Sequence, residues 1–205
     1  MPNSTVDPLA AGMAANAQAF GIVQPQNLHL KRYPFLFLVD TSQSVGEGGA
    51  DADIIAINEI LGQITAYLRV PPAASKLADM TEEIDVSILT YSDEVSEYKP
   101  WSLVAELPSH YNLQPLRTTA MAKAFEHALP HIGTRLKYYA DNNIPFGRPH
   151  IFHFTDGAPT DMRIGDKRWL ELADRLGRLD GTFSAEQVRA TINHFVSPNG
   201  CRITP

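Results

Sequence analysis

Residues 35–39 form an unbroken apolar run, Phe-Leu-Phe-Leu-Val, and polar residues follow it at once. An apolar run of this length, bounded by polar residues, predicts a strand buried on both faces, as in the centre of a parallel sheet. Asp40, Ser42 and Ser44 then place a carboxylate and two hydroxyls at alternate positions just beyond the strand. Hard oxygen ligands of this kind suit Mg²⁺ or Mn²⁺, and three of them do not saturate such an ion. The remaining ligands must therefore come from elsewhere in the chain.

The composition of the chain indicates a globular protein and excludes several other classes. With 205 residues, of which 44% are apolar and 20% charged, the chain suits one globular domain with a substantial core. Its formal net charge of −6 argues against nucleic acid as a partner, which would require a basic face. Cys201 is the only cysteine, so neither an intrachain disulfide nor a thiolate cluster can form. No apolar run is long enough for a membrane span, and no basic residue precedes Lys31 to support a signal peptide at residues 9–19. These features favour a cytoplasmic protein.

Strands and helices are predicted to alternate after residue 31. This alternation predicts right-handed βαβ units and a Rossmann-like α/β fold, in which helices cover both faces of an open, mainly parallel sheet with one antiparallel edge strand. Pro130 is expected to kink or divide the second helix. Apolar runs predict strands over residues 33–39, 84–91 and 148–155 and an edge strand within 94–106, and apolar residues at helical spacing predict helices over about 53–69, 120–139 and 169–179.

The two ends of the chain are harder to interpret. Residues 1–30 lack sustained periodicity and are expected to form an N-terminal arm or leader, which leaves residues 31–205 as the domain. Residues 184–187 resemble a capping box that would open a helix, whereas residues 191–196 could equally form a strand.

Polar side chains also follow a second predicted strand. That strand ends in Thr155 and Asp156, while Thr118 and Thr119 precede a predicted helix. In open α/β sheets, ligands bind outside the carboxyl ends of the strands, where such loops converge. Together with Asp40, Ser42 and Ser44, one of the two threonines and Asp156 would give five oxygen ligands from three loops. An octahedral ion such as Mg²⁺ would then keep one position for water or for an oxygen from a partner.

This order of motifs resembles the von Willebrand factor A (VWA) domain family and its metal-ion-dependent adhesion site. The resemblance covers roughly residues 31–165 and rests on Asp40-x-Ser42-x-Ser44, a threonine before a helix, and Thr155-Asp156-Gly157. Thr119 is preferred over Thr118 because it aligns Ala124 and Phe125, rather than Lys123 and Ala124, with an Ala-Leu pair of the family. The resemblance implies that the ion is bound, in part through water, by Asp40, Ser42, Ser44, Thr119 and Asp156.

Within the family, residues 84–91 and 148–161 look most similar to bacterial stand-alone members of the TerY type. That resemblance implies a cytoplasmic protein of stress-response or conflict gene clusters, in some cases beside a kinase and a phosphatase. The chain departs from the family pattern in three places. Arg117 and Thr118 replace a glycine pair, the loop after Ser44 is longer and richer in glycine, and the C-terminal end is expected to be shortened or rebuilt.

The function expected from these features is metal-dependent binding of a protein partner, whose Glu or Asp completes the coordination of the ion, without catalysis. An aspartyl-phosphate-type phosphatase is a second hypothesis, but such enzymes place a general acid two residues after the nucleophile, where this chain has Ser42. A structural subunit with a vestigial site is a third. Asp161 is expected to cap a helix, and His150 and His153 should point to opposite faces of their strand.

Overall fold

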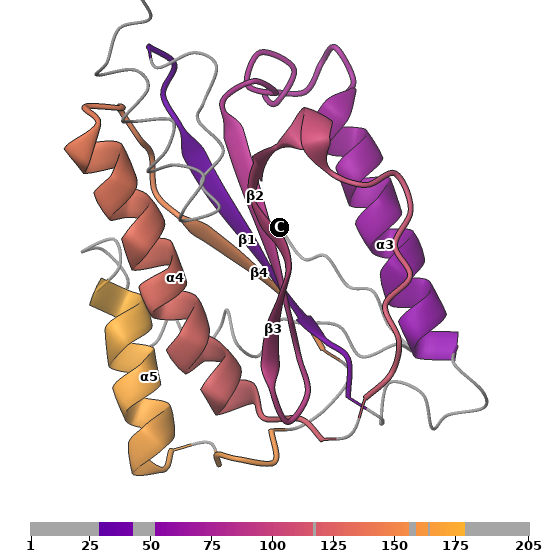
Figure 1. Ribbon diagram of the computed structural model, residues 1–205, viewed down its shortest axis with the longest axis vertical. Coiled ribbons are helices and arrows are strands. Elements are labelled where there is room, and N and C mark those ends of the chain that lie inside the picture. The colour runs from indigo at the N-terminus through magenta and orange to yellow at the C-terminus, as the bar shows by residue number, and fades with distance from the viewer. Residues whose placement is uncertain (1–28, 43–51, 117, 156–158, 164, 179–205) are drawn as a thin grey trace, which may run out of the picture.

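The computed structural model describes residues 29–42, 52–116, 118–155, 159–163 and 165–178 (Figure 1). Predictions for the N-terminal arm up to residue 28, the glycine-rich loop at 46–49 and the segment 184–196 lie outside these residues. Along the chain, the helices and strands are β1 (Tyr33–Asp40), α3 (Ala52–Arg69), β2 (Ile84–Tyr91), β3 (Val95–Leu103), the short 3₁₀ helix η1 (Val104–Glu106), α4 (Met121–Asp141), β4 (His150–Phe154) and α5 (Lys167–Arg178).

The strands form one sheet in the order β3-β2-β1-β4. β1 pairs in parallel with both β2 and β4, and β3 runs antiparallel to β2 at the edge. This arrangement confirms the predicted mainly parallel sheet with an antiparallel edge strand. The register places Asp40 opposite Tyr91 and Val39 opposite Phe154, so the carboxyl ends of three strands lie at the same edge.

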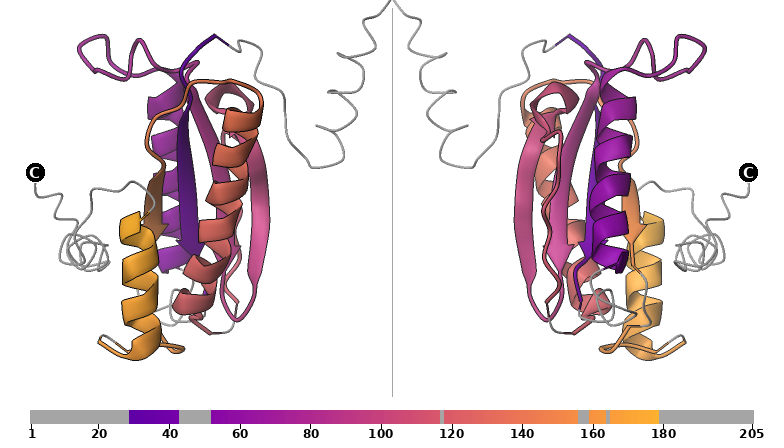
Figure 2. Two further views of the ribbon diagram at one scale, coloured as in Figure 1. Left: turned by 90° about the vertical axis from the view of Figure 1, so that its left-hand side faces the viewer. Right: turned by 90° about the vertical axis from the view of Figure 1, so that its right-hand side faces the viewer.

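Alternate side chains of β1 serve two separate cores. Leu36 and Leu38 pack beneath α4 and α5 with residues such as Phe125, Ile132 and Trp169. Phe37 and Val39 pack on the other face, beneath α3. Figure 2 shows the sheet between these layers, with α3 on one side and α4 and α5 on the other. Because β1 is covered on both faces, every side chain from Leu36 to Asp40 is buried, which explains its continuous apolar sequence.

The predicted division of the second helix at Pro130 is wrong. α4 runs as one helix from Met121 to Asp141 with Pro130 inside it. Pro130 lies on the exposed side of the helix, where water can satisfy the carbonyl that loses its backbone donor. None of the helices in the described part of the chain is both long and apolar enough to cross a lipid bilayer.

Candidate metal site at the carboxyl end of the sheet

Asp40, the last residue of β1, is completely buried. Its side chain lies on the face of the sheet that α4 covers, where both carboxylate oxygens accept hydrogen bonds. Oδ1 accepts one from the backbone N–H of Ser42 at 2.9 Å. Oδ2 accepts one from the hydroxyl of Thr155 at 2.7 Å and a longer one from the hydroxyl of Tyr91 at 3.3 Å. The carboxylate is thus held in one orientation by the chain on both sides of β1.

All three of these donors are neutral. Within the described residues, no Lys, Arg or His forms an ion pair with Asp40, whereas the buried Asp85 pairs with two arginines. Taking an ionised carboxylate out of water is costly unless a cation compensates its charge. Asp40 is therefore well placed to act as a ligand for a metal cation, and the nearby hydroxyl oxygens are of the type that coordinates Mg²⁺.

The loop before α4 is tied to the ends of β1 and β2. The backbone N–H of Leu116 donates to the carbonyl of Thr41, and that of Ala120 donates to the carbonyl of Ser92 at 2.8 Å. Thr119 lies between these two anchors and is only 4% exposed. Its carbonyl accepts hydrogen bonds from both the backbone N–H and the hydroxyl of Thr160. These contacts place Thr119 in the same group of loops as Asp40.

Three of the five predicted ligands fall within the described residues. Asp40, Ser42 and Thr119 all lie at this edge of the sheet, and all three are buried. Thr118, the alternative to Thr119, is exposed. Ser44 and Asp156 lie outside the described residues. No group of three His, Cys, Asp or Glu side chains with metal-binding geometry occurs among the described positions, so this part of the site depends on one carboxylate and hydroxyl oxygens.

Two aromatic residues outside the predicted metal-binding motif lie next to Asp40. The hydroxyl of Tyr91, at the end of β2, lies 2.7 Å from Nε2 of His153 on β4. Both side chains are buried, and burial lowers the pKa of His153 to about 3, so the ring is neutral at physiological pH. The period-two alternation of strands predicted that His150 and His153 point to opposite faces, and the structure confirms this.

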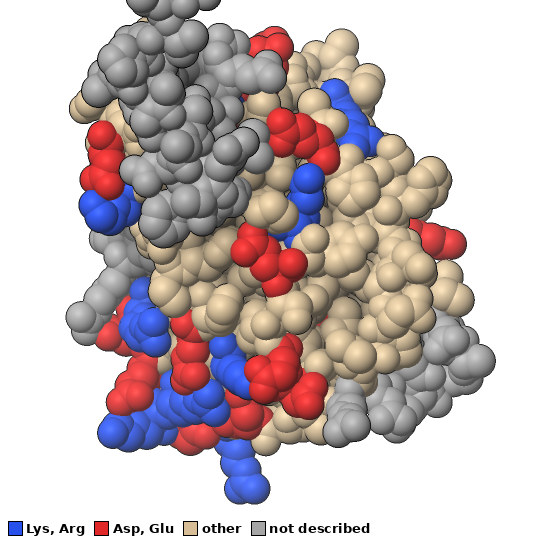
Figure 3. Space-filling model, in the orientation of Figure 1, with Lys and Arg blue, Asp and Glu red and all other residues tan. Residues whose placement is uncertain are grey.

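Asp161 caps α4, as the sequence predicted. Its two carboxylate oxygens accept the backbone N–H groups of Ala122 and Lys123, each at 3.0 Å, which satisfies donors that the first turn of a helix leaves free. Arg168 of α5 lies 3.3 Å from Asp161 and also pairs with Glu126. Figure 3 shows acidic and basic side chains side by side over α4 and α5. This mixture of signs is unlike the basic face that nucleic acid requires.

Comparison with known proteins gives only distant likenesses. No family model and no curated protein matches the chain. Among solved structures, the vWF domain of the type V pili tip protein Mfa5 from Porphyromonas gingivalis matches with 15% identity and a TM-score of 0.42, covering 63% of this chain and 39% of that one. The PilB minor pilin from Streptococcus sanguinis matches with 14% identity and a TM-score of 0.43, covering 66% and 32%.

The ArnB paralog VWA2 from Sulfolobus acidocaldarius gives a similar result, with 18% identity, a TM-score of 0.40, and coverage of 66% of this chain and 30% of that one. The chain thus spans between 30% and 39% of the length of these solved chains. Such values are too low to identify a family or a function. The α/β fold is therefore assigned from the strand order and from the helices that cover both faces of the sheet.

Proposed function

We propose that the chain is a VWA-type interaction domain that binds a protein partner through a divalent metal ion, without catalysing a reaction. The observation that carries this proposal is the carboxylate of Asp40, which is completely buried at the carboxyl end of β1 and, within the described part of the chain, is hydrogen-bonded only by neutral groups. Ser42 and Thr119, from the same loops, would hold Mg²⁺ or Mn²⁺ with Asp40, and Ser44 and Asp156 would complete the protein ligands.

The ion would supply a Lewis-acidic point on the surface, to which a Glu or Asp of the partner can attach. The residues of this chain orient the ligands. The backbone of Ser42 and the side chains of Thr155 and Tyr91 fix the carboxylate of Asp40, and the two anchors at Leu116 and Ala120 fix the loop that carries Thr119. Outer groups of this kind set the orientation of metal ligands and thereby their affinity for the ion.

The residue two positions after Asp40 supports a binding role over the nucleophilic role of a phosphatase. Ser42 stands where such an enzyme would place its general acid, and a serine hydroxyl is a poor proton donor for this reaction. We further propose, from the sequence resemblance to TerY-type proteins, that the domain acts in the cytoplasm in a bacterial stress-response or conflict system, with a kinase or phosphatase of the same gene cluster as its partner.

Calorimetric titration of Mg²⁺ and Mn²⁺ tests the metal site. We expect binding by the wild type and none by Asp40→Asn, which keeps the shape of the side chain but removes its charge. Asp141→Asn is the matched control, because Asp141 lies at the far end of α4 and pairs only with the exposed Lys137. Equal binding by wild type and Asp40→Asn would refute the metal site.

Capture of partners on immobilised protein tests the interaction itself. We expect proteins that bind in Mg²⁺ to be released by chelator, and to be absent when Asp40→Asn is immobilised. If the metal binds but chelator leaves the captured proteins unchanged, the site has a structural role and the proposed docking mechanism is wrong.

A further inference from the structure

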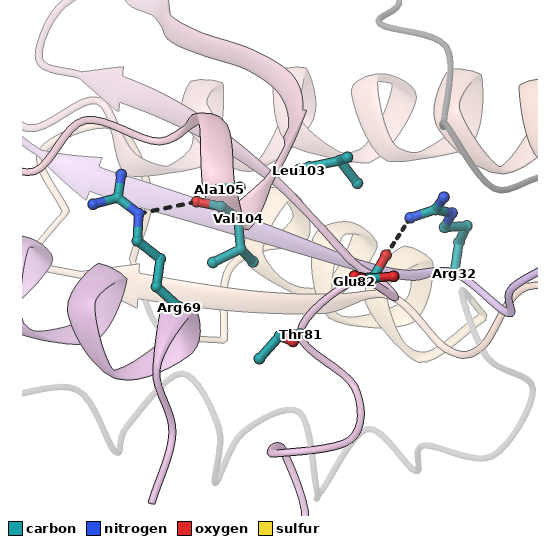
Figure 4. A pocket seen from close by; sticks show the side chains of 7 residues that line it. All are labelled: Arg32, Arg69, Thr81, Glu82, Leu103, Val104 and Ala105. Atoms are coloured by element: carbon teal, nitrogen blue, oxygen red, sulfur yellow. Dashed lines mark hydrogen bonds between the residues drawn. The ribbon is translucent and has the colours of Figure 1, made fainter.

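A cavity of about 410 Å³ opens at the amino end of the sheet, at the opposite end of β1 from Asp40. It lies between Arg32, just before β1, and Arg69, in the last turn of α3 (Figure 4). The loop before β2 at residues 81–82 and the junction of β3 with η1 at residues 103–105 complete its lining. At about 3.3 Å per residue, the two ends of β1 are roughly 23 Å apart. This cavity is thus separate from the candidate metal site.

Arg69 brings a positive charge to the cavity that the described residues do not neutralise. Its guanidinium donates hydrogen bonds to the carbonyls of Val104 and Leu107 and to the hydroxyl of Ser109. All three acceptors are neutral, and Arg69 forms no ion pair with a carboxylate in the described part of the chain. The hydrogen bonds hold the side chain of Arg69 in one position. Its conformational entropy is therefore already reduced in the free protein, and binding a ligand does not have to reduce it again.

Arg32 adds a second positive charge from a different element. Its side chain is only 1% exposed, and Nη1 donates to the backbone carbonyl of Glu82. The nearby carboxylate of Asp85, at 3.7 Å, is shared with Arg135, so Asp85 offsets only part of the charge of Arg32. A charge at a buried position is screened less by water than a charge on the surface.

We propose that this cavity binds a small anion through carboxylate or phosphate oxygens that face Arg69, with Arg32 adding to the positive potential. Guanidinium groups are well suited to such oxyanions because their planar donors match the geometry of both. The volume lies in the range of small-molecule sites, which suits a small anion. The carboxylate of Glu82, which is exposed at the lining, disfavours polyanions and leaves one net positive charge among the lining side chains.

NMR titration of the ¹⁵N-labelled protein tests the cavity, with inorganic phosphate in one series and succinate in another, both at constant ionic strength. We expect saturable shifts of the amides of residues 81–83 and 103–105 and no shift at residues 40–42. The anion whose shifts saturate at the lower concentration shows whether the cavity prefers a phosphate or a carboxylate. Shifts that do not saturate with either anion, or that occur equally over the whole surface, would overturn the proposal.

Variants of the lining residues sharpen this test. Arg69→Gln should weaken binding at least about tenfold, since a hydrogen bond to a charged group is lost. Glu82→Gln keeps the backbone carbonyl that Arg32 uses, and should bind the anion about two to three times more tightly because a repulsive charge is removed. Unchanged affinity in Glu82→Gln would contradict the proposal even if Arg69→Gln failed to fold.

Two controls separate this site from its alternatives. Lys137→Gln also removes one positive charge, from an exposed position on α4, and should leave anion binding unchanged. An equal loss in Lys137→Gln and Arg69→Gln would mean that only net charge matters. Asp40→Asn should bind the anion like the wild type, so a failure of the metal site and a failure of the anion site can be told apart.

Discussion

Two buried aspartates lie on neighbouring strands beneath α4, and they differ in whether arginines of the described residues balance their charge. Asp85, at the amino end of β2, is 1% exposed and pairs with Arg135 at 2.7 Å and Arg32 at 3.7 Å, and it accepts a hydrogen bond from the hydroxyl of Tyr139. Asp40, at the carboxyl end of β1, is equally buried but is surrounded by neutral donors.

The comparison distinguishes a structural carboxylate from a carboxylate available for a ligand. The protein supplies its own cations to Asp85, and Arg135 is further held by the rings of Tyr138 and Tyr139 at 5.0 and 4.9 Å from its guanidinium carbon. Asp40 has hydrogen bonds that orient it, and no cation among the described residues pairs with it. The same residue type, at similar burial, is thus paired with arginines at one end of the sheet, whereas at the other end it belongs to the proposed metal site.

The largest expected effect comes from breaking the pair at the amino end. Asp85→Asn leaves Arg135 buried without its carboxylate, which should lower the free energy of unfolding by about 3–5 kcal/mol. Urea denaturation of the chelator-treated protein measures the change. Asp141→Asn, which breaks the exposed pair with Lys137, should cost less than about 0.5 kcal/mol. Similar decreases in the free energy of unfolding for both variants would mean that Asp85 stabilises the fold no more than an exposed aspartate does.

Asp40→Asn should behave in the opposite way. In chelator, removing a buried negative charge that no cation of the described residues balances should leave stability unchanged or raise it. In Mg²⁺ at a hundred times the dissociation constant, the wild type should gain about 2.7 kcal/mol and the variant nothing. Urea denaturation with and without Mg²⁺ gives both values. A large loss of stability for Asp40→Asn in chelator would show that Asp40, like Asp85, is already balanced by the protein.

The fold was largely predictable because its signals are local. The apolar run of β1 and the helical spacing of α3 each reflect burial against neighbouring elements, and both matched the structure within one or two residues. The edge position of β3 followed from Pro100, which cannot donate a hydrogen bond to a neighbouring strand. Division at Pro130 was wrong because periodicity does not say whether the freed carbonyl faces solvent.

The candidate site was predictable only where a motif marks it. That Asp40, Ser42 and Thr119 lie at one edge was predicted because they follow a strand end or precede a helix, and parallel strands bring such positions together. Their role as metal ligands stays a prediction. Asp85 and its arginines were missed, because contacts between residues about 50 positions apart leave no pattern in a single sequence. Tyr91 and His153 were missed for the same reason, since nothing in the sequence says that their side chains meet.

A smaller effect is expected from Tyr91→Phe, which tests whether the neutral donors position Asp40 for a metal. The substitution removes the hydroxyl 3.3 Å from Oδ2 of Asp40, and loss of such an outer hydrogen bond should weaken metal binding about tenfold, or about 1.4 kcal/mol. Calorimetric titration of Mn²⁺ measures it. Tyr98→Phe, an exposed position on β3, is the control. Equal affinities of Tyr91→Phe and wild type would show that Thr155 and Ser42 alone orient the carboxylate.

The smallest expected effect concerns pH at the amino end of the sheet. His131, on α4 one turn before Arg135, is stacked on Trp101 and lies 2.9 Å from the hydroxyl of Ser87. Burial, with smaller contributions from His127 and Arg135, lowers the pKa of His131 to about 4. Since the ordinary pKa is about 6.5, the unfolded state takes up the proton first, and the stabilisation present above pH 6.5 is lost as the pH falls toward 4.

Urea denaturation at pH 7 and pH 5 measures this loss. After a discount for the part of the ring that water reaches, His131 should account for about 1 kcal/mol of the difference between the two pH values. His131→Gln should therefore reduce the pH dependence by that amount, whereas His110→Gln, at an exposed position in the loop between η1 and α4, should not change it. If His131→Gln leaves the pH dependence unaltered, protonation of His131 does not destabilise the folded state. The folded protein would then tolerate a second positive charge beside Arg135.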